Sequence, residues 1–127
     1  MKKIFHFALV VLFTSMFINC SSSSEEEVYS IVGTWSFSQS IENGIDVLSD
    51  CERNGTVTFN EDKSFEGKYF ALNNSNCVLD DTLTGTWSKL NNGEYTLVSK
   101  QVTISFSGEN TLIVRENGKE DYEVWVR

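Results

Sequence analysis

The sequence predicts an all-β protein, a small eight-stranded antiparallel up-and-down barrel that follows a signal peptide and a flexible tether. Two observations from residue 31 onward predict the barrel. Apolar and polar side chains alternate with the period of two that is typical of strands. Short turn sequences separate these segments, with no helix of useful length between them. A sandwich of six to eight strands is the alternative fold.

Eight segments show this alternation, and each should turn one face toward the core. The expected inner faces, in chain order, are Trp35, Phe37, Gln39 and Ile41; Val57 and Phe59; Phe65, Gly67, Tyr69 and Ala71; Leu83, Gly85 and Trp87; Tyr95 and Leu97; Val102, Ile104 and Phe106; Leu112 and Val114; and Tyr122, Val124 and Val126. Ile113 and Trp125 fall on the opposite faces of the last two segments. Closing eight strands into a barrel removes the two exposed edges of an open sheet.

The connections between the expected strands are mostly tight turns. They fall at residues 60–63, 91–93, 107–110 and 117–118, where Asn and Gly accept the positive φ that such turns require. Two longer loops, residues 42–54 and 72–81, follow the first and third strands. Because strand direction alternates in a meander, both loops should lie at the upper end of the barrel, away from the tether. Loops in such a place commonly carry binding functions.

Cys51 and Cys77 lie one in each of these loops. The remaining cysteine, Cys20, belongs to the N-terminal segment, so the folded part of an exported chain has a single cysteine pair, which predicts a disulfide. The meander independently brings the two loops together. Two metal ligands are the alternative, which is weak because the only histidine, His6, lies in the expected signal segment. No metal is expected.

The N-terminal segment has the features of an export signal. Lys2 and Lys3 precede an uncharged apolar run over residues 4–18, which is shorter than the roughly 20 residues of a membrane-spanning helix. Cys20 follows the run, and residues 21–27 are serines and glutamates. We expect a signal peptide over residues 1–19, a Ser/Glu-rich tether over residues 20–30 and one folded domain over residues 31–127.

This N-terminal order resembles that of bacterial lipoproteins, in which the cysteine becomes the first residue of the mature chain and carries acyl chains. The resemblance implies a lipid on Cys20 that attaches the protein to the outer membrane, on its periplasmic or cell-surface face. An ordinary signal peptide with an unmodified Cys20 is the alternative. Two or three acyl chains would make the attachment effectively permanent.

The composition excludes several classes of function. The net charge is −8, and removal of a signal that carries two lysines would make the chain more acidic still, so nucleic acid is not expected as a partner. Without His6 the chain has no imidazole for a general base or a catalytic triad. We therefore expect no enzyme activity and no cofactor. The acidic residues interpreted as solvated loop residues rather than acid–base pairs are Asp46, Asp50, Glu52, Asp80 and Asp81.

The triplet Gly33-Thr34-Trp35 resembles the Gly-x-Trp signature of lipocalins. The domain as a whole is similar to the lipocalin-like domains of Bacteroidota lipoproteins, on the evidence of the cysteine pair, the second triplet Gly85-Thr86-Trp87 and the closing residues 122–127. In lipocalins a basic residue from late in the chain packs over the tryptophan. Arg127 or Arg115 could do so here.

The resemblance implies that a small hydrophobic ligand binds inside the barrel. The candidate lining residues are Trp35, Phe37, Val57, Phe59, Tyr69, Trp87, Tyr95 and Phe106. Gly67 and Gly85 on the expected inner face would leave room for it. The alternative is that these side chains only fill the core, since eight strands enclose space for side chains or for one small ligand. The barrel would then act through its acidic upper loops, as an interaction or inhibitor module for a cationic protein.

Overall fold

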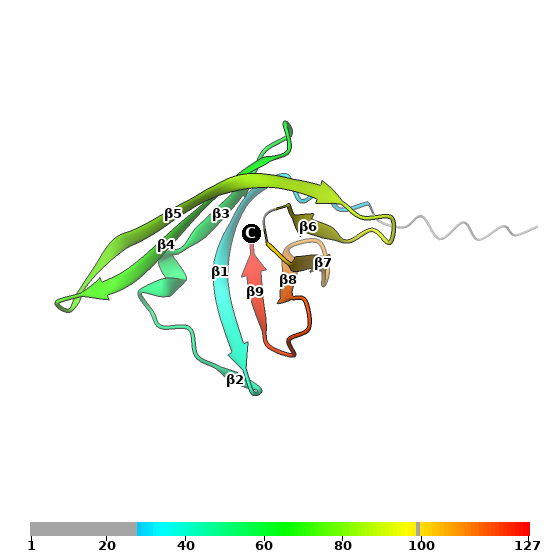
Figure 1. The fold of residues 1–127 in the computed structure, drawn as a ribbon. Coiled ribbons are helices and arrows are strands. Elements are labelled where there is room, and N and C mark those ends of the chain that lie inside the picture. The colour runs from blue at the N-terminus through cyan, green and yellow to red at the C-terminus, as the bar shows by residue number, and fades with distance from the viewer. Residues whose placement is uncertain (1–27, 99) are drawn as a thin grey trace, which may run out of the picture.

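The computed structural model describes residues 28–98 and 100–127. In this part the chain forms nine strands and one short 3-10 helix, η1 (Glu52–Asn54). The strands are β1 (Gly33–Glu42), β2 (Ile45–Asp46), β3 (Thr56–Phe59), β4 (Ser64–Asn73), β5 (Asn76–Lys89), β6 (Tyr95–Leu97), β7 (Val102–Phe106), β8 (Thr111–Glu116) and β9 (Tyr122–Val126). β2 pairs only with the end of β1, and the other strands form one antiparallel sheet that the β1–β9 ladder closes (Figure 1). The predicted eight-stranded up-and-down barrel is confirmed.

The expected signal peptide, the lipid attachment site Cys20 and most of the tether lie outside the described residues. Within the described ranges, no helix is long and apolar enough to cross a membrane. We call the end of the barrel at which β1 begins the lower end, and the end at which β1 finishes the upper end. The described chain enters at the lower end, because Val28 to Val32 precede β1 directly.

The lower end of the barrel is closed by the segment before β1. Trp35 donates its indole N–H to the carbonyl of Ile31 at 2.8 Å, and both side chains are at most 1% exposed. The ring of Tyr29 lies 5.3 Å from that of Phe106. These contacts place apolar side chains across the lower opening of the barrel.

Arg127 is the basic residue that packs over Trp35. Its guanidinium carbon lies 4.5 Å from the centre of the indole ring, and its Nη1 donates to the carbonyl of Ser30 at 3.1 Å. Arg115 instead covers the ring of Tyr122 at 4.8 Å. Of the two candidates from the sequence, Arg127 therefore has the lipocalin-like position.

The expected inner face of β9 is wrong. Trp125 is 3% exposed and lies inside the barrel, while Val124 and Val126 are only partly buried on the outer face. The alternation of Tyr122, Val124 and Val126 had suggested that these three residues face the core. Trp125 takes the inner position because its ring can stack there, 5.4 Å from the ring of Phe37 and 6.3 Å from that of Phe59.

The expected face of β1 is correct only as far as Phe37. Phe37 pairs with Trp125, but Gln39 pairs with Val124, so Ser38 is an extra residue that forms a β-bulge. Beyond the bulge the two faces exchange, which turns Gln39 outward and Ser40 inward. The guanidinium of Arg53 donates a hydrogen bond to the carbonyl of Ser38, so η1 supports the bulge.

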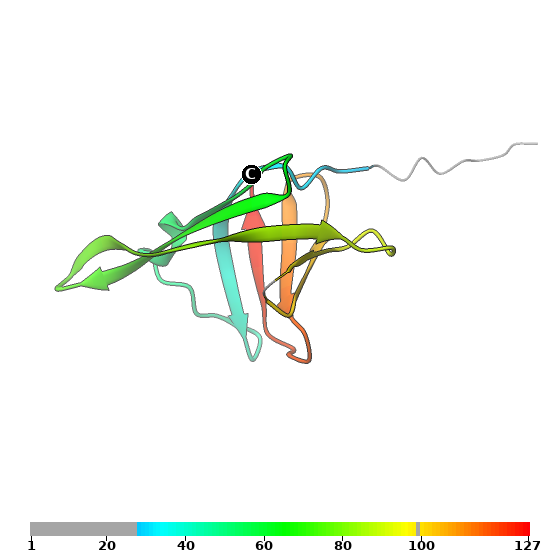
Figure 2. The same cartoon turned by 45° about the horizontal axis from the view of Figure 1, so that its top comes forward.

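The expected loop over residues 72–81 is also wrong, because β4 and β5 continue through it. A two-residue turn at Asn74 and Ser75 joins the strands, and both residues have positive φ (49° and 67°), as a tight hairpin turn requires. Figures 1 and 2 show this hairpin reaching away from the barrel, on the side opposite β6 and β7. We call its outer part, residues 70–80, the arm.

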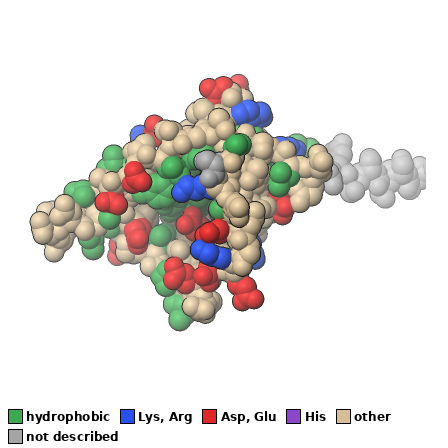
Figure 3. Space-filling model, in the orientation of Figure 1, with side chains coloured by type: hydrophobic (Ala, Val, Ile, Leu, Met, Phe, Trp, Pro, Cys, Tyr) green, Lys and Arg blue, Asp and Glu red, His purple; other side chains and the backbone are tan. Residues whose placement is uncertain are grey.

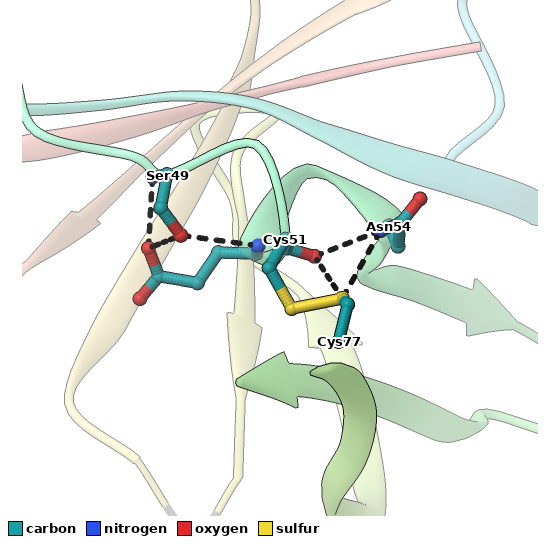
Figure 4. The surroundings of a disulfide bond; sticks show 5 residues. Ser49, Cys51, Asn54 and Cys77 are labelled. Carbon is teal, nitrogen blue, oxygen red and sulfur yellow. Dashed lines mark hydrogen bonds between the residues drawn. A yellow bond between two sulfur atoms is a disulfide. The ribbon is translucent and has the colours of Figure 1, made fainter. Parts of the chain in front are cut away.

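The predicted disulfide between Cys51 and Cys77 is confirmed, with 5.4 Å between the two Cα atoms. It joins the start of η1 to the arm (Figure 4). Asn54 supports the bridge by donating its side-chain amide to the Cys51 carbonyl at 3.1 Å and to Cys77 Sγ at 3.3 Å. On the other side of Cys51, the carboxylate of Glu52 accepts hydrogen bonds from the backbone and the hydroxyl of Ser49.

Gly55 allows the chain that leaves η1 to touch the core. Its carbonyl accepts the backbone N–H of Phe37 at 3.0 Å, and a Cβ at this position would lie 2.2 Å from Cδ2 of the Phe37 ring. The φ of Gly55 is −64°, so close approach and not backbone conformation requires glycine here.

Removal of the disulfide should destabilise the protein. The bridge closes a loop between residues 26 apart, so replacing both cysteines by alanine should lower the free energy of unfolding by about 3 to 4 kcal/mol. Urea unfolding followed by circular dichroism measures this, with the oxidised wild type as the reference. Coincident unfolding curves for the variant and the wild type would show that the bridge does not contribute to the free energy of unfolding.

Gly55→Ala should also destabilise the protein, by about 1 to 3 kcal/mol, because the added methyl group collides with the ring of Phe37. A double-mutant cycle provides the control. In a Phe37→Leu background the collision is relieved, so Gly55→Ala should cost less there than in the wild type. Additive losses in urea unfolding would contradict this contact.

Candidate functional site

Most candidate lining residues fill the lower and middle parts of the barrel. Five of them are at most 5% exposed: Trp35, Val57, Phe59, Trp87 and Tyr95. They pack on one another, with the ring of Trp87 6.2 Å from that of Phe59 and 5.7 Å from that of Tyr95. Phe37 is 9% exposed, and Phe106 is half-buried against Tyr29 at the closed lower end. This region has the packing of a core.

The space expected beside Gly67 and Gly85 is occupied. A Cβ on Gly67 would lie 3.0 Å from the ring of Tyr69, and a Cβ on Gly85 would lie 2.7 Å from the ring of Phe65. Both glycines therefore let a neighbouring aromatic ring lie over the backbone. They do not provide a pocket in this arrangement.

The upper end of the barrel is different, because its inner positions are only partly buried. They form what we call the upper mouth, with one residue each from β1, β4, β5, β7 and β9: Ser40, Tyr69, Leu83, Val102 and Glu123. Phe37 and Trp125 lie one inner position below, where their rings form a floor. The face of the molecule in Figure 3 is hollowed over β1 and β9, with hydrophobic side chains in the hollow and charged ones beside them.

Strand register places Glu123 inside the mouth. Glu123 lies directly opposite Ser40 of β1 and Val114 of β8, and Val114 is 5% exposed on the inner face. Residues directly opposite each other in a ladder share a face of the sheet. The carboxylate of Glu123 accepts the indole N–H of Trp125, two residues further on, at 2.8 Å. The mouth therefore contains a carboxylate held by a neutral donor.

The surroundings of Glu123 disfavour its charge. Burial raises the pKa of its carboxyl group, and the hydrogen bond from Trp125 and the charge of Lys100 offset this only in part. None of the four ion pairs among the described residues involves Glu123. Lys100 thus acts on this carboxylate from beyond direct contact.

Tyr69 lies across the mouth from Glu123. Burial, followed by the negative charges of Glu123 and Asp81, raises the pKa of its phenol to about 12, so the hydroxyl stays protonated at neutral pH. No hydrogen bond between this hydroxyl and a described residue contributes to the raised pKa. The hydroxyl is consequently able to donate to a bound molecule.

The upper mouth therefore combines apolar surface with polar groups that have unused hydrogen-bonding capacity. Leu83 and Val102 offer the apolar part, and Glu123 and Tyr69 offer an acceptor and a donor. Sites for small molecules commonly combine these two kinds of surface. In the described part of the chain, no group of three His, Cys, Asp or Glu side chains is placed to hold a metal ion.

Sequence reasoning found only Tyr69 of the five mouth residues as a candidate. Ser40 was missed because nothing in the sequence marks the bulge at Ser38, and Glu123 because the faces of β9 were exchanged. Leu83 and Val102 were expected to face inward but were not singled out. A preference for placing a tryptophan inside would have found Glu123, since residues two apart in a strand share a face.

Two of the acidic residues expected in solvated loops, Asp46 and Glu52, have partners within the segment that joins β1 to η1. Asp46 pairs with Arg53 at 2.7 Å, and this contact lowers the pKa of its carboxyl group, followed by hydrogen bonds from Leu48 and Ser40. Glu52 bonds to Ser49, which lowers its pKa in the same way. These two carboxylates organise the loop between β1 and η1.

Comparison with known proteins agrees with this geometry. Residues 31–123 match the family model described as a lipocalin-like domain. No curated protein and no solved structure matches the chain. The match covers most of the chain and runs from Ile31, just before β1, to Glu123 in β9, so it includes nearly the whole barrel. The chain belongs to the lipocalin-like domain family.

Proposed function

We propose that this protein binds a small molecule with an apolar body and a polar head in the upper mouth of its barrel. The observation that carries the proposal is the pair Glu123 and Tyr69. Both side chains are half-buried on the inner face of a closed barrel, and both have polar atoms that the described residues leave largely unused. In a barrel whose only task is a filled core, apolar residues would be expected at these positions.

The filled lower half limits the size of the ligand. Phe37 and Trp125 close the floor, so the bound molecule would lie on Leu83 and Val102 rather than enter deeply. Such a shallow site suits a ligand of a few carbon atoms. Deeper entry would require the ring of Tyr69 to leave its place over Gly67.

We further propose that the protein works as an exported lipoprotein, attached to the outer membrane through a lipid on Cys20. The basic start, the short apolar run and the position of the cysteine support this. The described chain enters at the lower end of the barrel, so the tether would point the upper mouth away from the membrane.

A second candidate function is favoured by the arm. Leu72, Val78 and Leu79 are 64%, 38% and 52% exposed on it, which is unusual for apolar side chains held in a strand pair. Together with the acidic residues of the upper loops, they would suit a cationic protein partner. A complex that survives at low salt, dissociates at high salt and is lost in Leu79→Ser would support this function.

Native mass spectrometry of the lipidated protein extracted from its own host tests the ligand-binding proposal. We expect a reproducible added mass beyond that of the acyl chains. Ser40→Leu should fill the mouth and remove the added mass, because Ser40 faces Glu123. Ser36→Leu, on the outer face of the same strand, is the matched control and should retain it. An added mass retained in both variants would place the ligand elsewhere.

Glu123→Gln should stabilise the protein near neutral pH. A carboxyl group with a raised pKa keeps its proton longer in the folded than in the unfolded chain, so stability falls as the pH rises past the ordinary value of 4.5. The melting temperature of the variant should therefore exceed that of the wild type at about pH 7, and the difference should shrink toward about pH 4. Glu61→Gln, in the exposed β3–β4 turn, is the control. A variant less stable than the wild type at pH 7 would contradict this account of Glu123.

A further inference from the structure

We infer that the upper mouth selects an organic cation, with the ammonium group against the Glu123 carboxylate and the Tyr69 ring and the apolar part on Leu83 and Val102. This inference rests on the proposed function and specifies its ligand. Three independent features of the described chain support it, namely the partners of Glu123, the distribution of cations over aromatic rings, and the charge around the mouth.

Among the described residues, Glu123 has no ion-pair partner. A carboxylate has about four acceptor sites, and among the described residues only the indole N–H of Trp125 uses one of them. A half-buried charge that is not paired costs free energy of folding. A cation in the mouth would pair with this carboxylate while Trp125 keeps it in place.

The aromatic rings on the inner face of the barrel differ in whether a cation of the chain lies over them. At the lower end, Arg127 lies 4.5 Å from the centre of the Trp35 ring, and Lys63 lies 4.0 Å from that of Trp87. Lys89 lies 5.8 Å from the ring of Tyr95. At the upper end, Arg115 covers the ring of Tyr122 on the outer face at 4.8 Å. In the described ranges no Lys or Arg lies over the ring of Tyr69, which packs beside Phe37 at 5.3 Å, so this ring has no cation of the described chain on it.

The charge around the mouth disfavours an anionic ligand. Asp81 lies opposite Tyr69 in the β4–β5 ladder, and both Asp81 and Glu123 act on the phenol as negative charges. Lys100 is a basic residue whose charge acts on Glu123, so a ligand carboxylate attracted by Lys100 would also meet the like charge of Glu123. The chain as a whole carries a net charge of −8, which attracts cations and repels anions.

Three probes of equal chain length test the inference: hexyltrimethylammonium, hexanoate and 1-hexanol. Each is titrated calorimetrically into the full chain, held in a detergent with an uncharged head group. The cation should bind at least about tenfold more tightly than hexanoate, a difference of about 1.4 kcal/mol. Glu123→Gln should weaken binding of the cation by about 10- to 100-fold, as expected for a lost charged contact. It should change binding of hexanol by less than about threefold, because glutamine keeps an acceptor oxygen for the hydroxyl.

Glu61→Gln removes the same charge from the exposed β3–β4 turn and should leave all three affinities unchanged. Binding of hexanol to Glu123→Gln shows that this variant keeps a folded mouth. Equal affinities for the three probes, unaffected by Glu123→Gln, would overturn the selection of cations and leave small-molecule binding standing. Failure of every probe to bind the wild type would overturn both. Tighter binding of hexanoate would assign the mouth to anions held by Lys100 and Tyr69.

Discussion

The ladder between β1 and β9 is the constraint on which the rest of this structure depends. It joins the first long strand to the last and so removes both edges of the sheet. The same ladder contains the bulge at Ser38. Below the bulge, Phe37 and Trp125 face each other as part of the core, and above it Ser40 faces Glu123. Without the extra residue, the larger side chains of Gln39 and Ile41 would point into the upper end.

The short helix η1 connects this bulge to the arm. Arg53 bonds to the Ser38 carbonyl and pairs with Asp46, while Cys51 at the start of the helix is bridged to Cys77 of the arm. One turn of chain thus fixes both β1 at the bulge and β4–β5 beyond the barrel. Tyr69 lies on β4 just before its register shift, so the disulfide helps to hold that wall of the mouth.

The sequence was sufficient for the barrel because that prediction depends on alternation and turn chemistry, which are local. The cysteine pairing followed from the count of cysteines, since Cys51 and Cys77 are the pair left in the folded domain, and strand direction agreed with it. The errors concern registers: nothing around Ser38 marks a bulge, and in residues 122–126 alternation does not say which of two apolar faces is inside. Residues 72–81 were expected to form a loop because they are mostly polar and contain a cysteine. In the structure they continue the two strands and turn only at Asn74 and Ser75. The upper mouth was missed because it contains Ser40, which follows the bulge, and Glu123, which lies on the face of β9 that was expected to point outward.

The two ends of the barrel differ in how completely their inner side chains are packed and paired. At the lower end the indole N–H groups of Trp35 and Trp87 donate to the carbonyls of Ile31 and Asn60, and Arg127 and Lys63 lie over the two rings. Both tryptophans are buried, and burial of such large rings contributes strongly to the stability of a small domain. The upper end can therefore carry a carboxylate whose charge burial disfavours. On the proposed function, a carboxylate whose charge costs stability in the free protein would gain a partner when a cationic ligand binds, so relief of that cost would contribute to the binding free energy.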